Sequence, residues 1–108
     1  MKKKKQKMRL SKSEIEIIKR VAGEVWGNKT TVLLFGSRTD DSKKGGDIDL
    51  YIHLTEEQKP KKIMQLKAEF LGKLDILIGE QKIDVLVRTQ FNHLLPIIKT
   101  AQLTGIAL

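Results

Sequence analysis

An unbroken alternation of apolar and polar residues from 47 to 54 constrains the fold of this 108-residue chain more than any other feature. Successive side chains of a β-strand point to opposite faces, so the alternation predicts a strand with one buried face and one polar face. The apolar set is Ile48, Leu50 and Ile52, and the polar set is Asp47, Asp49, Tyr51 and His53. We expect the polar face to be acidic and solvated, with Asp47 and Asp49 pointing the same way.

Two further strands are predicted, one before and one after this segment in the chain. Residues 31–35 are apolar, rich in β-formers and bounded by Asn28 and Gly36, which indicates a buried strand. Residues 82–87 form another apolar run with a single acid, Asp84, whose carboxylate would be costly to bury without a partner. If this last strand lies beside residues 47–54, Asp84 can complete a cluster of three carboxylates with Asp47 and Asp49.

Two amphipathic helices are predicted from hydrophobic periodicity. The first follows a Ser-x-x-Glu capping box that begins at Ser11, and Gly27 is its natural stop. The second spans residues 59–78, with Pro60 tolerated in its first turn. Their expected buried stripes are Ile15, Ile18, Ala22, Val25 and Trp26 in the first helix, and Ile63, Leu66, Phe70, Leu74 and Leu77 in the second.

A third helix is predicted over about residues 93–103, with Asn92 as its N-cap and Pro96 near its start. Gly105 stops this helix, and the last residues are expected to pack back as a short extended segment. Strands that alternate with helices predict an α/β (α+β) fold in which one small mixed sheet is backed by helices.

A tight turn after the first strand is a candidate phosphate site. Gly36 allows the backbone to approach a ligand closely, and Ser37 and Arg38 add a hydroxyl and a guanidinium. Asp47 and Asp49 would repel each other unless a cation lay between them, and hard oxygen ligands suit Mg²⁺. A phosphate site beside a Mg²⁺ site implies a nucleoside triphosphate. The competing interpretation, an ordinary turn followed by solvated acids at strand ends, requires three coincidences.

Phe35-Gly36-Ser37-Arg38, Asp47-Ile48-Asp49-Leu50 and Asp84 in its own strand together resemble the nucleotidyltransferase superfamily, which includes DNA polymerase beta and kanamycin nucleotidyltransferase. The small size and the Gly105-Ile106-Ala107-Leu108 ending look most like the minimal MNT type. The resemblance covers roughly residues 30–106. One departure is visible, because nine residues separate Ser37 from Asp47 where the MNT pattern usually has ten.

The resemblance implies nucleotidyl transfer, an in-line displacement at the α-phosphorus of a nucleoside triphosphate. Asp47 and Asp49 would then be ligands to two Mg²⁺ ions, and Asp84 would bind the catalytic ion and accept the proton of the acceptor hydroxyl. Gly36 and Ser37 would hold the β- or γ-phosphate, with Arg38 as a phosphate clamp.

The resemblance also implies a partner. MNT-type proteins resemble antitoxins encoded beside a helical HEPN-type ribonuclease toxin, and the implied activity is AMP transfer from ATP to a toxin tyrosine. The small chain leaves no room for an acceptor-binding domain, so we expect a partner subunit or a protein acceptor, and an oligomer formed with that partner. Two alternatives stay open: the catalytic half of a two-subunit enzyme for a small molecule such as an aminoglycoside, and a non-catalytic module that neutralises a toxin by contact.

The net charge of +8 suggests nucleic-acid binding, but its distribution argues against that function. Six of the 21 basic residues lie within residues 1–9, and the remaining 15 nearly balance 13 acidic residues. We therefore divide the chain into a basic, disordered tail (1–10) and a nucleotidyltransferase domain (11–108), with nucleic acid unlikely as a direct ligand. The chain has no cysteine and no apolar run long enough to span a membrane, which fits the cytoplasm.

Three side chains near these motifs have both a functional and a structural interpretation. Trp26 could stack on a base, but its place at the end of an apolar helical stripe favours the core. His53 is expected to be a surface residue at a strand end. Tyr51, on the acidic face, could itself be modified.

Overall fold

The computed structural model describes residues 10–35, 48–54, 56–79, 82–89 and 92–108. These residues form a mixed α/β fold of three helices and four strands, as the sequence predicts. In chain order they are α1 (Lys12–Trp26), β1 (Thr31–Phe35), β2 (Ile48–His53), α2 (Pro60–Ile78), β3 (Ile83–Val87), α3 (Pro96–Thr104) and β4 (Ile106–Ala107). No helix in the described ranges combines the length and the apolar character needed to cross a bilayer.

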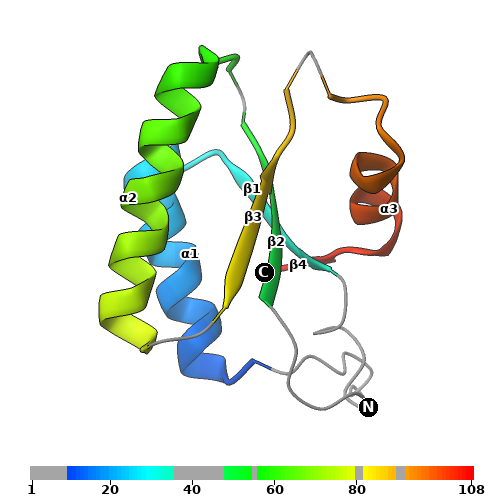
Figure 1. The fold of residues 1–108 in the computed structure, drawn as a ribbon. Helices are drawn as coiled ribbons and strands as arrows, with labels where there is room; N and C mark the ends of the chain where they lie inside the picture. Colours follow the sequence, from blue (N-terminus) through cyan, green and yellow to red (C-terminus); the bar gives the residue numbers. More distant parts are fainter. Residues whose placement is uncertain (1–9, 36–47, 55, 80–81, 90–91) are drawn as a thin grey trace.

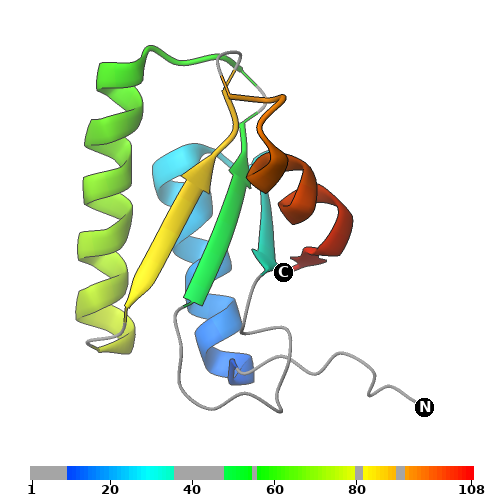
Figure 2. The same cartoon turned by 45° about the vertical axis from the view of Figure 1, so that its right-hand side comes forward.

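The four strands form one sheet in the order β3-β2-β1-β4. β2 pairs with β1 antiparallel and with β3 parallel, and the short β4 pairs with β1 antiparallel. α1 and α2 lie side by side on one face of this sheet, whereas α3 lies by itself on the other (Figure 1 and Figure 2). The molecule is therefore a three-layer sandwich with unequal outer layers.

The larger core lies between the sheet and the α1–α2 pair. Alternate residues of β2 enter it, and Ile48, Leu50 and Ile52 have no exposed surface. Val85 and Val87 of β3 join them, so the predicted alternation is confirmed in both strands. Burying this continuous apolar layer is the dominant favourable term that holds the two helices on the sheet.

A second, smaller core lies under α3 and consists of Phe35, Tyr51, Ile98 and Ala101. It corrects the expectation that the polar face of β2 is solvated throughout, because Tyr51 is only 1% exposed. The ring packs under the helix, and its hydroxyl oxygen accepts a hydrogen bond from Gln102 Nε2 at 3.0 Å. A phenol held in this way is not available as a modification site.

The capping box of α1 forms as predicted. Ser11 Oγ accepts a hydrogen bond from the Glu14 backbone N–H at 3.1 Å, and Glu14 Oε1 accepts one from the Ser11 N–H at 2.9 Å. Gly27 ends the helix with a φ of 111°, in the region that favours glycine. Leu10, which we assigned to the tail, is buried against the larger core, in the position of a hydrophobic staple.

Trp26 at the end of α1 belongs to the core, as expected. Its side chain is 8% exposed, and its ring meets Phe70 of α2 edge to face at a centroid distance of 5.8 Å. This geometry is a favourable one for aromatic pairs, and it leaves no exposed ring face for a base.

The second helix follows the prediction except at its end. Ile63, Phe70 and Leu74 are buried, but Leu77 is 45% exposed and Ile78 packs against the core in its place. The reason is geometric, since Leu74 and Ile78 are four residues apart and share one helix face.

The third helix begins later than predicted, at Pro96, with Leu95 rather than Asn92 as its N-cap. Leu95 is extended, with φ −66° and ψ 143°, as the residue before a proline prefers to be. Asn92 instead stabilises the turn before α3 through hydrogen bonds of its side chain. Its Oδ1 accepts from the Thr89 N–H at 2.7 Å, and its Nδ2 donates to the Val87 carbonyl at 3.0 Å.

Candidate active site

The candidate site begins with a row of three side chains across the sheet. In the strand register, Phe35 of β1 lies opposite Asp49 of β2, and Asp49 lies opposite Asp84 of β3. The sequence leaves open whether the third strand lies beside residues 47–54, and the register shows that β3 does pair with β2. Period-two alternation puts all three side chains on the face that α3 covers, away from the larger core.

The two carboxylates differ in exposure. Asp49 is half-buried in the central strand β2, whereas Asp84 is exposed because β3 is at the edge of the sheet. The cost of placing a carboxylate in an apolar β run is thus avoided, because Asp84 faces away from the core that Val85 enters. An acid in this position can reach a molecule that approaches the sheet edge from solvent.

The two aspartates line a cleft of about 890 Å³ between the sheet and α3. Its sheet wall contains Phe35, Asp49, Asp84, Val85 and Leu86, and its helix wall contains Pro96, Ile97, Thr100 and Thr104. The volume lies within the range that small-molecule and cofactor sites occupy. One wall therefore offers negative charge, and the other offers apolar surface with two hydroxyl groups.

The helix wall was not predicted from the sequence as part of the site. Ile97, Thr100 and Thr104 follow helical spacing, so they share one side of α3. The Thr104 hydroxyl donates to the Thr100 carbonyl at 2.7 Å, which leaves its oxygen lone pairs to accept from a ligand. The spacing could have indicated a common side, but only the packing of α3 on the sheet shows that this side faces the aspartates.

Four predicted site residues, Gly36, Ser37, Arg38 and Asp47, lie outside the described residues. Their roles stay predictions. The chain nevertheless leaves β1 at Phe35 and enters β2 at Ile48, and these two residues lie at the same end of the antiparallel pair, where Phe35 faces Asp49. The segment that carries both motifs is thus attached next to the Asp49–Asp84 pair.

The carboxylates of Asp49 and Asp84 are suitable ligands for a hard cation, but two carboxylates do not form a complete metal site. No group of three histidine, cysteine, aspartate or glutamate side chains comes together in the part of the chain that the structure describes. Asp49 and Asp84 supply carboxylate oxygens in adjacent register, and such oxygens are the protein ligands that Mg²⁺ accepts. The cluster of three carboxylates stays a prediction, because Asp47 is its third member.

His53 lies outside the site. It lies four residues after Asp49 on the same face of β2, beyond the buried Tyr51. Its side chain is exposed, as expected. Its Nε2 is 3.5 Å from Arg88 Nη1, and its ring lies 6.3 Å from that of Tyr51. The histidine therefore belongs to the opposite end of the sheet face from the carboxylate pair.

A mixed sheet with two aspartates in adjacent register at a cleft suits phosphate transfer assisted by a divalent cation. Comparison with known families agrees, because the model of the nucleotidyltransferase domain family matches residues 15–104. The chain belongs to this family. A comparison with curated proteins gave no match.

Proposed function

We propose that this chain is a Mg²⁺-dependent adenylyltransferase that moves AMP from ATP to a protein hydroxyl. The acceptor in this proposal is a tyrosine of a helical HEPN-type ribonuclease toxin, so that the chain acts as an antitoxin. The single observation that supports the chemistry most strongly is the in-register Asp49–Asp84 pair at the cleft of a nucleotidyltransferase domain.

The chemistry follows from what each residue can offer. The acceptor oxygen forms a bond to the α-phosphorus, the bond to pyrophosphate breaks, and the acceptor proton passes to the exposed carboxylate of Asp84. Asp49 and Asp84, with Asp47, would hold Mg²⁺. Bound there, the metal supplies positive charge that offsets the charge developing on the phosphate oxygens. Ser37 and Arg38 would bind the departing phosphates.

The exposure of the site supports a large acceptor. Asp84 is exposed on an edge strand, and the cleft is open to solvent between that strand and α3. A hydroxyl carried on the surface of a folded protein can therefore approach the aspartates without entering a closed cavity. ATP as the donor and tyrosine as the acceptor rest on the MNT resemblance rather than on a described contact.

The test is the intact mass of the helical protein encoded next to this chain, after incubation with the chain, ATP and Mg²⁺. A gain of one or more AMP units is expected, and it should be absent with the Asp47→Asn, Asp49→Asn double variant. A stable complex with no mass gain would reject protein adenylylation and favour either neutralisation by contact or a small-molecule acceptor. Protection from the toxin by an Asp49→Asn variant that still binds it would favour contact alone.

A further inference from the structure

The helix α3 crosses the face of the sheet that carries Asp49 and Asp84. Just before the helix, Asn92 Nδ2 donates to the carbonyl of Val87 at the end of β3, so α3 begins on the β3 side. Just after the helix, β4 pairs with β1, so α3 ends on the β1 side (Figure 2). The cleft between the sheet and α3 therefore has two ends, one at the sheet edge beside β3 and one beside β1.

The β3 end of the cleft has apolar walls. Leu86 lies two residues after Asp84 on the same face of β3, about 7 Å farther along the strand. Pro96 and Ile97, at the start of α3, belong to the helix wall of the same cleft. Seven large hydrophobic side chains are exposed among the described residues, and of these Ile97, at 52%, lines the cleft. This end can therefore bury a neutral, hydrophobic part of a ligand.

The β1 end of the cleft suits the triphosphate of the donor. The predicted phosphate-binding residues follow Phe35 directly in the chain, and Phe35 lies opposite Asp49 at the end of β1. The leaving phosphates would therefore extend from the aspartates toward β1. The α-phosphorus carries the nucleoside on one oxygen and pyrophosphate on another, so the nucleoside takes a different direction. The direction that the cleft offers is toward Leu86 and Ile97.

We infer that the β3 end of the cleft binds the donor nucleoside, with the base between Leu86 and Ile97 and the ribose beside Thr100. This inference rests on the proposed use of a nucleoside triphosphate as donor. A base is planar, and its faces suit apolar walls. Thr100 lies three residues after Ile97 on the same side of α3, and its hydroxyl can donate to or accept from a sugar hydroxyl. The exposed Asp84 is left open to the acceptor.

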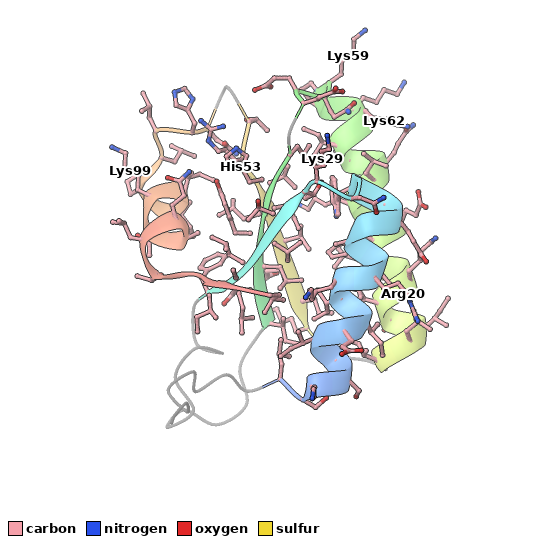
Figure 3. The ribbon with its side chains drawn as sticks, turned by 180° about the vertical axis from the view of Figure 1, so that it is seen from behind. Arg20, Lys29, His53, Lys59, Lys62 and Lys99 are labelled. Carbon is pink, nitrogen blue, oxygen red and sulfur yellow. The ribbon has the colours of Figure 1, made fainter. Side chains whose placement is uncertain are left out.

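The test compares Ile97→Ala with Leu103→Ala in the binding of Mg²⁺-ATP to the full chain, measured by calorimetry. Leu103 is the matched control, because it is an exposed apolar residue of α3 outside the cleft. It lies four residues after Lys99, which projects from α3 away from the sheet (Figure 3). Ile97→Ala is expected to raise the Kd for ATP about fivefold or more, because it removes apolar surface that the base would cover. Leu103→Ala should leave this Kd unchanged.

Inorganic tripolyphosphate separates the contribution of the nucleoside from that of the phosphates. With Mg²⁺ it should bind equally to wild type, Ile97→Ala and Leu103→Ala, since it has neither base nor sugar. Two results would overturn the inference: no weakening of ATP binding in Ile97→Ala, or an equal weakening of ATP and tripolyphosphate binding.

The ribose contact is tested with Thr100→Val, which removes the hydroxyl and nearly keeps the shape of the side chain. Wild type should bind ATP several-fold more tightly than 2′-deoxy-ATP or 3′-deoxy-ATP, and Thr100→Val should lose that preference. Thr100→Ser keeps the hydroxyl and should restore it. An unchanged preference in Thr100→Val would contradict the placement of the ribose beside Thr100.

AMP transfer distinguishes a failure of this inference from a failure of the proposed function. If Ile97→Ala raises the KM for the acceptor but not the Kd for ATP, the acceptor occupies this end of the cleft and the inference is wrong. If ATP binding depends on Ile97 but the helical protein gains no AMP, the nucleoside site stands and protein adenylylation fails. If wild type does not bind Mg²⁺-ATP, both are rejected.

Discussion

Among single residues, Asp49 and Asp84 matter most for the proposed phosphate transfer. Two carboxylates opposite each other on neighbouring strands repel, which disfavours the folded state unless a cation lies nearby. A cation that binds only the folded protein therefore stabilises it by mass action.

This leads to a prediction for metal binding. Adding Mg²⁺ should raise the Tm of the wild-type protein, with a stabilisation of about 1.4 kcal/mol at ten times the dissociation constant. The Asp84→Asn variant should show a much smaller rise, because it lacks one carboxylate of the pair. Thermal unfolding with and without Mg²⁺, with Asp75→Asn as an exposed control on α2, checks this expectation. Equal Mg²⁺ effects in all three proteins would count against a metal site at Asp84.

At the scale of elements, the site depends on how α3 is held against the sheet. Gly105 connects α3 to β4, and atoms of Ala101 and Leu33 fill the space around it. A Cβ at this position would lie 2.5 Å from the Ala101 carbonyl oxygen and 2.8 Å from Leu33 Cβ. Both are shorter than real Cβ contacts, so the helix or β1 would have to shift.

We therefore predict that Gly105→Ala destabilises the protein by about 1–3 kcal/mol, the usual cost of overpacking. Gly72→Ala is the matched control, since a Cβ there meets nothing within 4 Å and replaces glycine inside α2. That control should be neutral or stabilising, by up to about 1 kcal/mol. Urea unfolding of both variants measures the difference, and a neutral Gly105→Ala would show that α3 is not tightly packed at its end.

The same elements show what sequence patterns can and cannot predict. The strands and the capping box of α1 follow from local periodicity and turn chemistry, which act over a few residues. The juxtaposition of Asp49 with Asp84 depends in addition on the parallel pairing of β2 with β3, which joins residues distant in the sequence. The start of α3 was misplaced because Pro96 forces Leu95 out of the helix, although Asn92 is a good capping residue. The burial of Tyr51 could not be predicted, since an alternating strand does not show that a distant helix covers its polar side.

The three layers of the molecule have different roles. α1 and α2 bury one sheet face and stabilise the strands, whereas the lone α3 leaves the other face partly open (Figure 2). The cleft exists because α3 covers Tyr51 but not Asp84. The helix wall of the site depends on this tertiary arrangement, which explains why Thr100 and Thr104 were not predicted.

The role of the Asp49–Asp84 pair is tested by the rate of AMP transfer by the Asp84→Asn variant, measured beside wild type and Asp75→Asn. Removing a group that binds metal and accepts a proton should lower the rate by about 100-fold or more. The fold should be retained, because Asp84 is exposed. Asp75→Asn should transfer at the wild-type rate. Wild-type transfer by a folded Asp84→Asn variant would contradict the assignment of the reaction to the Asp49–Asp84 pair.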